Sequence, residues 1–413
     1  MKNVLFLTNC CHPVGSANGI CALEIAKCLS KDHNVFIVCD RKRGENEYYK
    51  YENIDIYKTP QRIVDDLFDF YEKTNGKYKK VIINLIRIVV QKTQQLICSF
   101  KYPFYGWIHL HKQYRLANDI CIKKNIDTVI VVVHPIESFI IANRLIKRHK
   151  NLNLVLYSLD RFSYGINIDS IMGRFKSKKM INWEKEMFKT CDMLLIMNAY
   201  KNYYSQMLFN EFRNKIYYTD IPLYRKLEME IKQTTNDKIR FIYSGALYSD
   251  IRNPKYLCEL FNKLPKNKFI LDFYSRGDCQ KLIESYSEIN NCIHCNGYVT
   301  REENINNLFS SDIIVSIGSI NCDMVPSKIF EYMSTGKKIM HIISYDNDAA
   351  VPYLRKYPNV LFIDSRGNID ENIDKLLKFI EKKESEIDDK LLDKLFKMNK
   401  PDYTAKLIEN NLK

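Results

Sequence analysis

Short apolar runs alternate with helical stretches over most of the chain. Helical periodicity lies between most of these runs, as in GICALEIAKCLSK from Gly19 to Lys31. The runs are nearly continuous in their apolar character, which is typical of parallel strands covered on both faces. Between residues 3 and 221 they read NVLFLTN, NVFIVCD, IDIYKTP, DTVIVVV, NLVLYSL, DMLLIMN and KIYYTDI. The alternation predicts an α/β fold with doubly wound parallel sheets.

The pattern breaks once, after Pro222, where residues 225–238 read RKLEMEIKQTTNDK and are polar. It then restarts with the runs IRFIYSG, KFILDFYS, NCIHCNG, DIIVSIGS, KIMHIIS and NVLFID. A chain of 413 residues is longer than a single hydrophobic core usually supports. We therefore predict a Rossmann-like domain over residues 1–222, a linker over 223–238 and a second Rossmann-like domain over 239–394, with a cleft between the domains as the default ligand site.

Charge is divided unequally between the two halves. Residues 1–220 hold 34 Lys plus Arg against 21 Asp plus Glu, whereas the remainder holds 29 against 28. The densest basic segment is 73–118, which has nine Lys or Arg, no acidic residue, and interleaved apolar residues such as Ile82, Ile86 and Trp107. A basic, amphipathic insertion of this kind favours docking on an anionic membrane surface. A solvated basic face and a nucleic-acid patch are the alternatives, although no nucleic-acid fold signature supports the latter.

The remaining features of the composition point to the cytoplasm. No apolar run reaches the roughly 18 residues that a membrane span needs, and the apolar start NVLFLTN is too short for a signal peptide. The 13 cysteines are scattered, and several lie in apolar runs, which predicts reduced core residues. Cys292 and Cys295 form a single CxxC, but a zinc site needs a second pair of ligands. We expect no metal.

One stretch of the second half carries candidate chemistry. The strand DIIVSIGS is followed by a loop with Asp323, and then by the helix SKIFEYMST, which Pro326 and Ser327 begin and Gly336 ends. In parallel sheets, ligands bind beyond the carboxyl ends of the strands, where a loop meets a helix N-terminus.

Spacing places Glu331 on this helix away from its apolar residues Ile329, Phe330 and Met333. Together with Asp323, it can accept hydrogen bonds from the hydroxyls of a bound polyol. The alternative is structural: Glu331 pairs with Lys328, and Asp323 caps the loop.

The strand, acidic loop, helix and terminal glycine resemble the donor-binding signature of GT-B glycosyltransferases, specifically the large retaining family (glycosyltransferase family 4 type) that carries an E-x7-E pattern. Asp323 and Glu331 occupy the two acidic positions, with Asp in place of the usual first Glu. The stretch PSKIFEYMSTGK is similar to the corresponding stretch in those family members that are common in bacterial surface-polysaccharide synthesis. The loop HPVGSANG after the first strand and the segment YSGALYSDIRNP extend the resemblance over most of the chain.

The resemblance implies roles for these residues. A nucleotide-diphosphate sugar carries two phosphates, which helix N-termini and fixed cations stabilise without a metal. Glu331 is expected to hold the ribose and Asp323 the transferred sugar. The other expected donor-binding residues are Gly15, Ser16, Gly245, Arg252, Tyr298, Val299, Pro326, Ser327 and Lys328. Alternatively, Gly15 forms only a turn, Gly245 only ends a strand, and Arg252 and Lys328 are only surface charges. By the same resemblance, the closing helix within 395–413 crosses back to the first domain.

The candidate residues for the acceptor follow two predicted strands of the first domain. Asp160 follows NLVLYSL and His134 follows DTVIVVV, so both are candidate catalytic residues. A core histidine and an Asp160–Arg161 pair are the alternatives. The DND at residues 346–348 matches a metal-binding D-x-D, but it is interpreted as a turn.

The resemblance therefore implies a hexosyltransferase-type glycosyltransferase that acts with retention of anomeric configuration. Its donor would be a nucleotide sugar and its acceptor a saccharide, most readily a lipid-linked one, at the cytoplasmic face of the membrane. A nucleotide-sugar epimerase or hydrolase of the same fold remains an alternative, as does a non-catalytic sugar-nucleotide-binding assembly protein.

Overall fold

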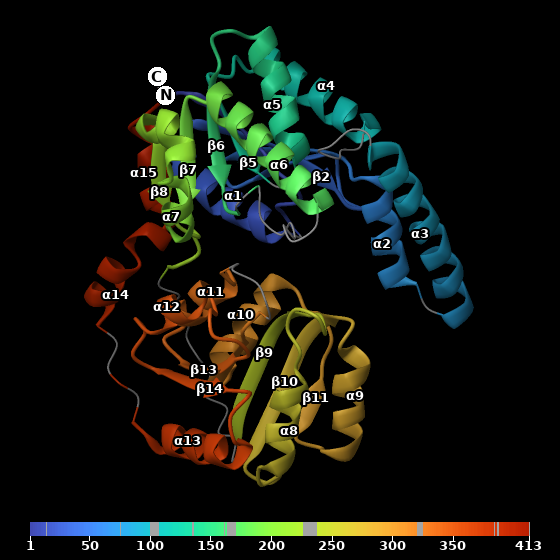
Figure 1. Ribbon diagram of the computed structural model, residues 1–413, viewed down its shortest axis with the longest axis vertical. Coiled ribbons are helices and arrows are strands. Elements are labelled where there is room, and N and C mark those ends of the chain that lie inside the picture. Colours follow the sequence, from blue (N-terminus) through green and yellow to red (C-terminus); the bar gives the residue numbers. More distant parts are fainter. Residues whose placement is uncertain are drawn as a thin grey trace. The chain divides into compact units, whose positions relative to one another are not determined.

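The computed structural model divides the chain into two compact units (Figure 1). Unit 1 comprises Met1–Pro222 and Met398–Lys413, and unit 2 comprises Leu223–Lys397. The structure describes residues 1–13, 15–74, 76–99, 107–133, 136–160, 162, 171–225, 238–319, 325–383, 385 and 388–412. Most of the predicted linker, residues 226–237, lies outside this part of the chain.

Unit 1 is built on an eight-stranded sheet with the strand order β3-β4-β2-β1-β5-β6-β7-β8. All neighbouring strands are parallel except β3 and β4. The strands are β1 (Asn3–Leu7), β2 (Asn34–Arg41), β3 (Tyr48–Tyr51), β4 (Ile54–Pro60), β5 (Thr128–Val133), β6 (Asn153–Ser158), β7 (Met193–Met197) and β8 (Ile216–Thr219). Every residue of β5 and β7 is buried, which explains their unbroken apolar sequences.

The helices of unit 1 connect these strands and flank the sheet. They are α1 (Ala17–Leu29), α2 (Ile63–Lys73), α3 (Lys77–Ser99), α4 (Trp107–Lys123), α5 (Ile136–Arg148), α6 (Ile171–Thr190), η1 (Asn198–Tyr200), α7 (Lys201–Tyr204), η2 (Met207–Lys215) and α15 (Pro401–Glu409). The last of these, α15, packs on α1 and β8. The Thr219 and Thr404 hydroxyls share a buried hydrogen bond, and Tyr217 donates to Asn411 Oδ1 at 2.8 Å.

Unit 2 contains a fully parallel six-stranded sheet with the order β11-β10-β9-β12-β13-β14. Its strands are β9 (Ile239–Leu247), β10 (Phe269–Gly277), β11 (Ile293–Cys295), β12 (Ile313–Ile317), β13 (Lys338–Ile343) and β14 (Val360–Asp364). Its helices are α8 (Lys255–Lys263), α9 (Gln280–Ile289), α10 (Arg301–Ser310), α11 (Lys328–Ser334), α12 (Val351–Leu354), α13 (Ile369–Glu381), α14 (Asp389–Leu395) and the short η3 (Lys397–Asn399) at the boundary of the units.

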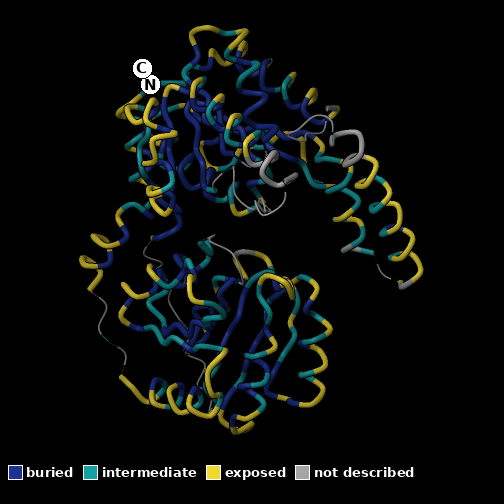
Figure 2. The backbone as a smooth tube through the Cα atoms, in the orientation of Figure 1, coloured by how far each residue is buried: buried dark blue, intermediate teal, exposed yellow. Residues whose placement is uncertain are grey.

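Thirteen apolar runs predicted as strands form strands, and the two parallel sheets confirm the predicted doubly wound α/β architecture. The prediction missed β3, whose sequence YYKY alternates exposed and half-buried residues at the antiparallel edge. Figure 2 shows the contrast between the buried strands and the outer faces of the helices.

Candidate active site

The strand order of unit 2 reverses beside β9. The chain continues from β9 to β10 on one side of the sheet, whereas β12 pairs with β9 on the other side. The connections that follow β9 and β12 therefore lead away from each other at the carboxyl ends of these strands. This is the position at which open α/β sheets bind ligands.

Arg252 connects the two diverging loops. Its backbone N–H donates to Tyr248 O at 2.7 Å, which folds the loop after β9 into a turn. Its side-chain Nε donates to Ser319 Oγ at 2.8 Å, and Ser319 is a buried residue just beyond β12. A predicted donor-binding cation is thus held at the reversal point of the sheet.

Lys328, the first residue of α11, contacts β9 near its carboxyl end. Its Nζ donates to Ser244 Oγ at 3.0 Å, and Ser244 is a buried residue of β9. The Tyr332 hydroxyl, one turn later, donates to Ser244 O at 2.7 Å. Burial raises the pKa of Tyr332 far above its ordinary value, so the phenol stays neutral and remains a donor. These two bonds fix the start of α11 against the end of β9.

Gly245 follows Ser244 with φ of +154°, a backbone conformation that side chains with a Cβ rarely adopt. A Cβ at this position would also lie 3.2 Å from the Tyr243 hydroxyl, which donates to Ala246 O at 3.3 Å. Burial raises the pKa of Tyr243 to about 12, so this hydroxyl too stays protonated. The positive φ within the last three residues of β9 therefore favours glycine at position 245.

Glu331 is half-buried on α11, and its neighbours Ile329, Phe330 and Met333 fill the core as predicted. Gly336 ends the helix region with φ of +76°, which confirms the predicted left-handed stop. Asp323, the other predicted acidic residue, lies outside the described residues.

The predicted start of this helix is only partly correct. Ser327 is the N-cap of α11, but its backbone is helical and its side chain makes no capping hydrogen bond. The Ser327 hydroxyl, predicted to cap the start of the helix, is thus not used for that purpose. Pro326 and Ser327 both lie half-buried before Lys328.

Tyr298 and Val299 lie in the loop between β11 and α10. Tyr298 is exposed, and the Arg276 guanidinium lies 5.0 Å from the centre of its ring. The next residue but one, Thr300, caps α10 in a reciprocal capping box with Glu303. Arg276 was not predicted from the sequence, because no motif links the end of β10 to this loop.

In unit 1, the loop after β1 is held by its own contacts. Ser16 is the N-cap of α1 and accepts from Gly19 N at 3.1 Å, while its hydroxyl also bonds Asn9 and Cys10 O. A Cβ on Gly15 would lie 2.6 Å from both Cys11 O and Ile20 Cγ1. Packing within the loop therefore already explains why residue 15 is glycine.

The acceptor-side candidates are less defined. Asp160 follows β6, and its carbonyl accepts a hydrogen bond from Ser158 Oγ at 2.7 Å. His134 and Arg161 lie outside the described residues.

The side chains of the two motifs that resemble metal sites, D-x-D and CxxC, form ion pairs or hydrogen bonds with other residues. Asp346 lies in a turn after β13 and pairs with Arg366 at 2.9 Å, while buried Asp348 pairs with His341 Nε2 at 3.0 Å. Cys292 Sγ donates to Lys266 O, and Cys295 Sγ to Gln280 Oε1. No group of His, Cys, Asp and Glu suited to a metal occurs among the described residues.

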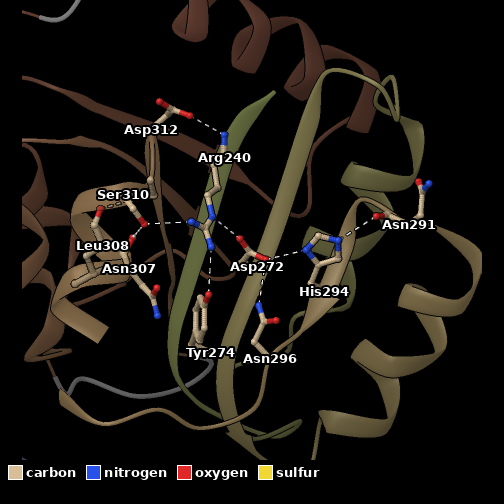
Figure 3. Close-up of polar contacts among 11 residues, drawn as sticks. Arg240, Asp272, Tyr274, Asn291, His294, Asn296, Asn307, Leu308, Ser310 and Asp312 are labelled. Atoms are coloured by element: carbon tan, nitrogen blue, oxygen red, sulfur yellow. Dashed lines mark hydrogen bonds and ion pairs between the residues drawn. The ribbon is translucent and has the colours of Figure 1, made fainter. Parts of the chain in front are cut away.

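A further polar cluster crosses β9, β10 and β11 (Figure 3). Asp272, which is buried, accepts from Arg240 Nε at 2.6 Å, His294 Nδ1 at 2.9 Å and Asn296 Nδ2 at 3.1 Å. The guanidinium of Arg240 also donates to Tyr274 and Ser310. Because these hydrogen-bond partners satisfy one another, we interpret the cluster as a structural polar layer of the sheet.

The comparisons with known proteins bear on the fold. No protein-family model matches the chain, and no curated protein matches its sequence. Among solved structures, the Escherichia coli trehalose-6-phosphate protein bound with UDP-2-fluoro glucose is similar with a TM-score of 0.59 and 13% identity, over 100% of this chain and 99% of that one.

Two further structures give the same result. The UDP-forming alpha,alpha-trehalose-phosphate synthase from Burkholderia xenovorans has a TM-score of 0.60 and 9% identity, over 100% of both chains. WaaG, a glycosyltransferase involved in lipopolysaccharide biosynthesis, has a TM-score of 0.57 and 11% identity, over 98% of this chain and 99% of that one. The chain thus has the GT-B fold of glycosyltransferases over its full length.

Proposed function

We propose that the protein is a retaining hexosyltransferase. It transfers a sugar from a nucleotide-diphosphate sugar to a saccharide acceptor, in our proposal a lipid-linked one, in the synthesis of capsule, O-antigen or exopolysaccharide. The observation that carries the proposal is the pair of cations, Arg252 and Lys328, at the carboxyl ends of β9 and β12. The GT-B fold supports it, because the similar structures include glycosyltransferases.

In the proposed reaction, the bond between the anomeric carbon and the donor's phosphate oxygen breaks, and its electron pair leaves with the diphosphate. Arg252, Lys328 and backbone N–H groups at the start of α11 stabilise that charge. The acceptor oxygen bonds to the anomeric carbon on the face that the diphosphate leaves, and its proton passes to a phosphate oxygen of the leaving group. This sequence of steps requires neither a metal nor another cofactor.

The remaining roles follow the same proposal. Glu331 accepts hydrogen bonds from the ribose hydroxyls and Asp323 from a hydroxyl of the transferred sugar. The backbone of Tyr298 and Val299 contacts the base, and the loop with Gly15 and Ser16 approaches the diphosphate. Asp160 and His134 serve the acceptor in unit 1. The protein would work in the cytoplasm, on the inner face of an anionic membrane.

Calorimetry of the whole protein against UDP-, GDP-, dTDP- and CMP-sugars tests the proposal. We expect one nucleotide class to bind, and Glu331→Ala to weaken that binding by on the order of tenfold or more. Glu302→Ala is the matched control, because Glu302 is an exposed acidic residue in the first turn of α10. Absence of binding to the whole panel, or equal binding by Glu331→Ala, would refute the donor site. Conversion of the donor without any acceptor would indicate an epimerase or hydrolase instead.

A further inference from the structure

One face of α3 exposes a continuous apolar stripe. Its six side chains are between 48% and 88% exposed, and their spacing over three turns puts them on one side of the helix: Tyr78, Val81, Ile82, Leu85, Ile86 and Val89. Exposed apolar residues are ordinary when they are scattered, but a contiguous stripe of this length indicates a surface that binds something. Figure 2 shows exposed residues along much of this helix.

The opposite side of α3 is already packed. Ile83 is buried, Lys80 Nζ lies 5.5 Å from the ring centre of Tyr71, and the Arg87 guanidinium lies 5.6 Å from that of Phe68. Both aromatic residues belong to α2, which lies beside α3 as a helical hairpin in Figure 1. The apolar stripe is therefore additional to the apolar surface that the hairpin needs for its own packing.

The charges beside the stripe are positive. Lys79 lies near its start and Lys92 just beyond its end, and both are exposed. The sequence has no acidic residue between Lys73 and Asn118. Three acidic residues of α2 have polar partners within unit 1: Asp65 pairs with Arg62 at 2.7 Å, Asp66 pairs with Arg43 at 2.6 Å, and Asp69 accepts from Gln61 at 2.8 Å. The partner of this surface should therefore be both apolar and anionic.

We infer that α3 lies in the plane of an anionic membrane surface, with its apolar stripe inserted among the acyl chains and its lysines at the head groups. The inference deepens the membrane association in the proposed function and rests on it. A second copy of the chain fits less well, because stripe-to-stripe packing would bring the same lysines together. None of the helices in the described part of the chain is long and apolar enough to cross a membrane.

Sedimentation of the full chain with vesicles tests this inference. We expect binding to phosphatidylcholine vesicles that contain about one-third phosphatidylglycerol, and much weaker binding to pure phosphatidylcholine. Ile82→Gln and Leu85→Gln should each weaken binding by on the order of tenfold, because an apolar side chain no longer leaves water. Lys79→Gln and Lys92→Gln should each weaken vesicle binding by about fivefold. At high salt, the difference between each lysine variant and the wild type should vanish, because salt screens the attraction to the anionic head groups.

Met207→Gln is the matched control, because Met207 is an exposed apolar residue of unit 1 away from α3. Equal vesicle binding by the Ile82→Gln/Leu85→Gln double variant would overturn the inference. So would self-association of the wild type that the double variant lacks, which would identify a second copy as the partner. Donor calorimetry on the same samples separates the two proposals: donor binding without vesicle binding refutes only the role of α3, and the reverse result refutes the donor site.

Discussion

Two cations near strand ends, one in each unit, have opposite surroundings. Lys58 of β4 is buried in unit 1, with its Nζ 2.7 Å from Glu45 Oε2, in hydrogen-bond contact with His12 O and over the ring of Tyr49. Arg252 of unit 2 is half-buried and rests on the neutral hydroxyl of Ser319. In the part of the chain that the structure describes, Arg252 forms no ion pair.

The difference separates a structural cation from a candidate ligand-binding one. The charge of Lys58 is neutralised inside the fold, and removing it would leave Glu45 with an uncompensated charge. The charge of Arg252 is positioned by a hydroxyl without being neutralised by it, so an incoming anion can use it. Position at a strand end is therefore a weaker indication of function than the nature of the partner.

The largest effect is expected for Lys58→Met. Because the substitution leaves Glu45 and the carbonyl of His12 without their cation, we expect the free energy of unfolding of unit 1 to fall by about 3–5 kcal/mol. Urea unfolding followed by circular dichroism measures it. Lys50→Met, at an exposed edge position on β3, is the control. Unchanged stability in Lys58→Met would contradict the interpretation of Lys58 as a structural cation.

Arg252→Met should affect binding and leave stability nearly unchanged. Loss of a charge-assisted contact to a phosphate should lower the affinity for the nucleotide sugar by about tenfold to a hundredfold. Titration calorimetry measures this affinity. Lys255→Met, three residues further on and exposed, should bind like the wild type. If both variants lose affinity equally, the effect is one of net charge and not of this site.

His109 of unit 1, like Lys58, is paired with a carboxylate, but its charge depends on pH. Its Nε2 lies 3.0 Å from Asp40 Oδ1, and its Nδ1 lies 2.9 Å from Pro60 O. Burial lowers the pKa of His109, but the hydrogen bond to Asp40 and its negative charge outweigh burial and raise the pKa above 6.5. The contribution to stability is therefore complete below the pKa of the unfolded imidazole and is lost as pH rises through the folded-state pKa.

We expect His109→Gln to lower the free energy of unfolding by about 2 kcal/mol at acidic pH and by less at alkaline pH. Thermal unfolding of the wild type and the variant across this pH range measures the difference. A difference that grows with rising pH would contradict the assigned protonation.

The smallest effect is expected for Tyr332→Phe. The change removes the hydroxyl that donates to Ser244 O, so the unfolding free energy of unit 2 should fall by about 1 kcal/mol. Tyr298→Phe is the control, because Tyr298 is exposed. Urea unfolding compares the two variants. A loss of donor affinity in Tyr332→Phe would show that fixing the start of α11 also matters for binding.

The strands were predictable because a strand buried on both faces must be apolar throughout, and each such run forms a strand. The edge strand β3 was missed, since half-exposed YYKY lacks that signal. Arg252 and Lys328 were predicted from a motif, but their partners Ser319 and Ser244 were not. A serine that accepts a hydrogen bond from a distant cation has no local signature in the sequence.

The amino-acid sequence by itself determined the order of strands and helices, the break between the two halves and the basic, apolar character of residues 73–118, because each follows from local periodicity and composition. Only the tertiary structure decided that β12 pairs with β9, that Arg252 meets Ser319 across the reversal, and that the apolar side of α3 faces outward. These relations depend on which elements pack together over long sequence separations, and packing of that kind is fixed by the whole fold.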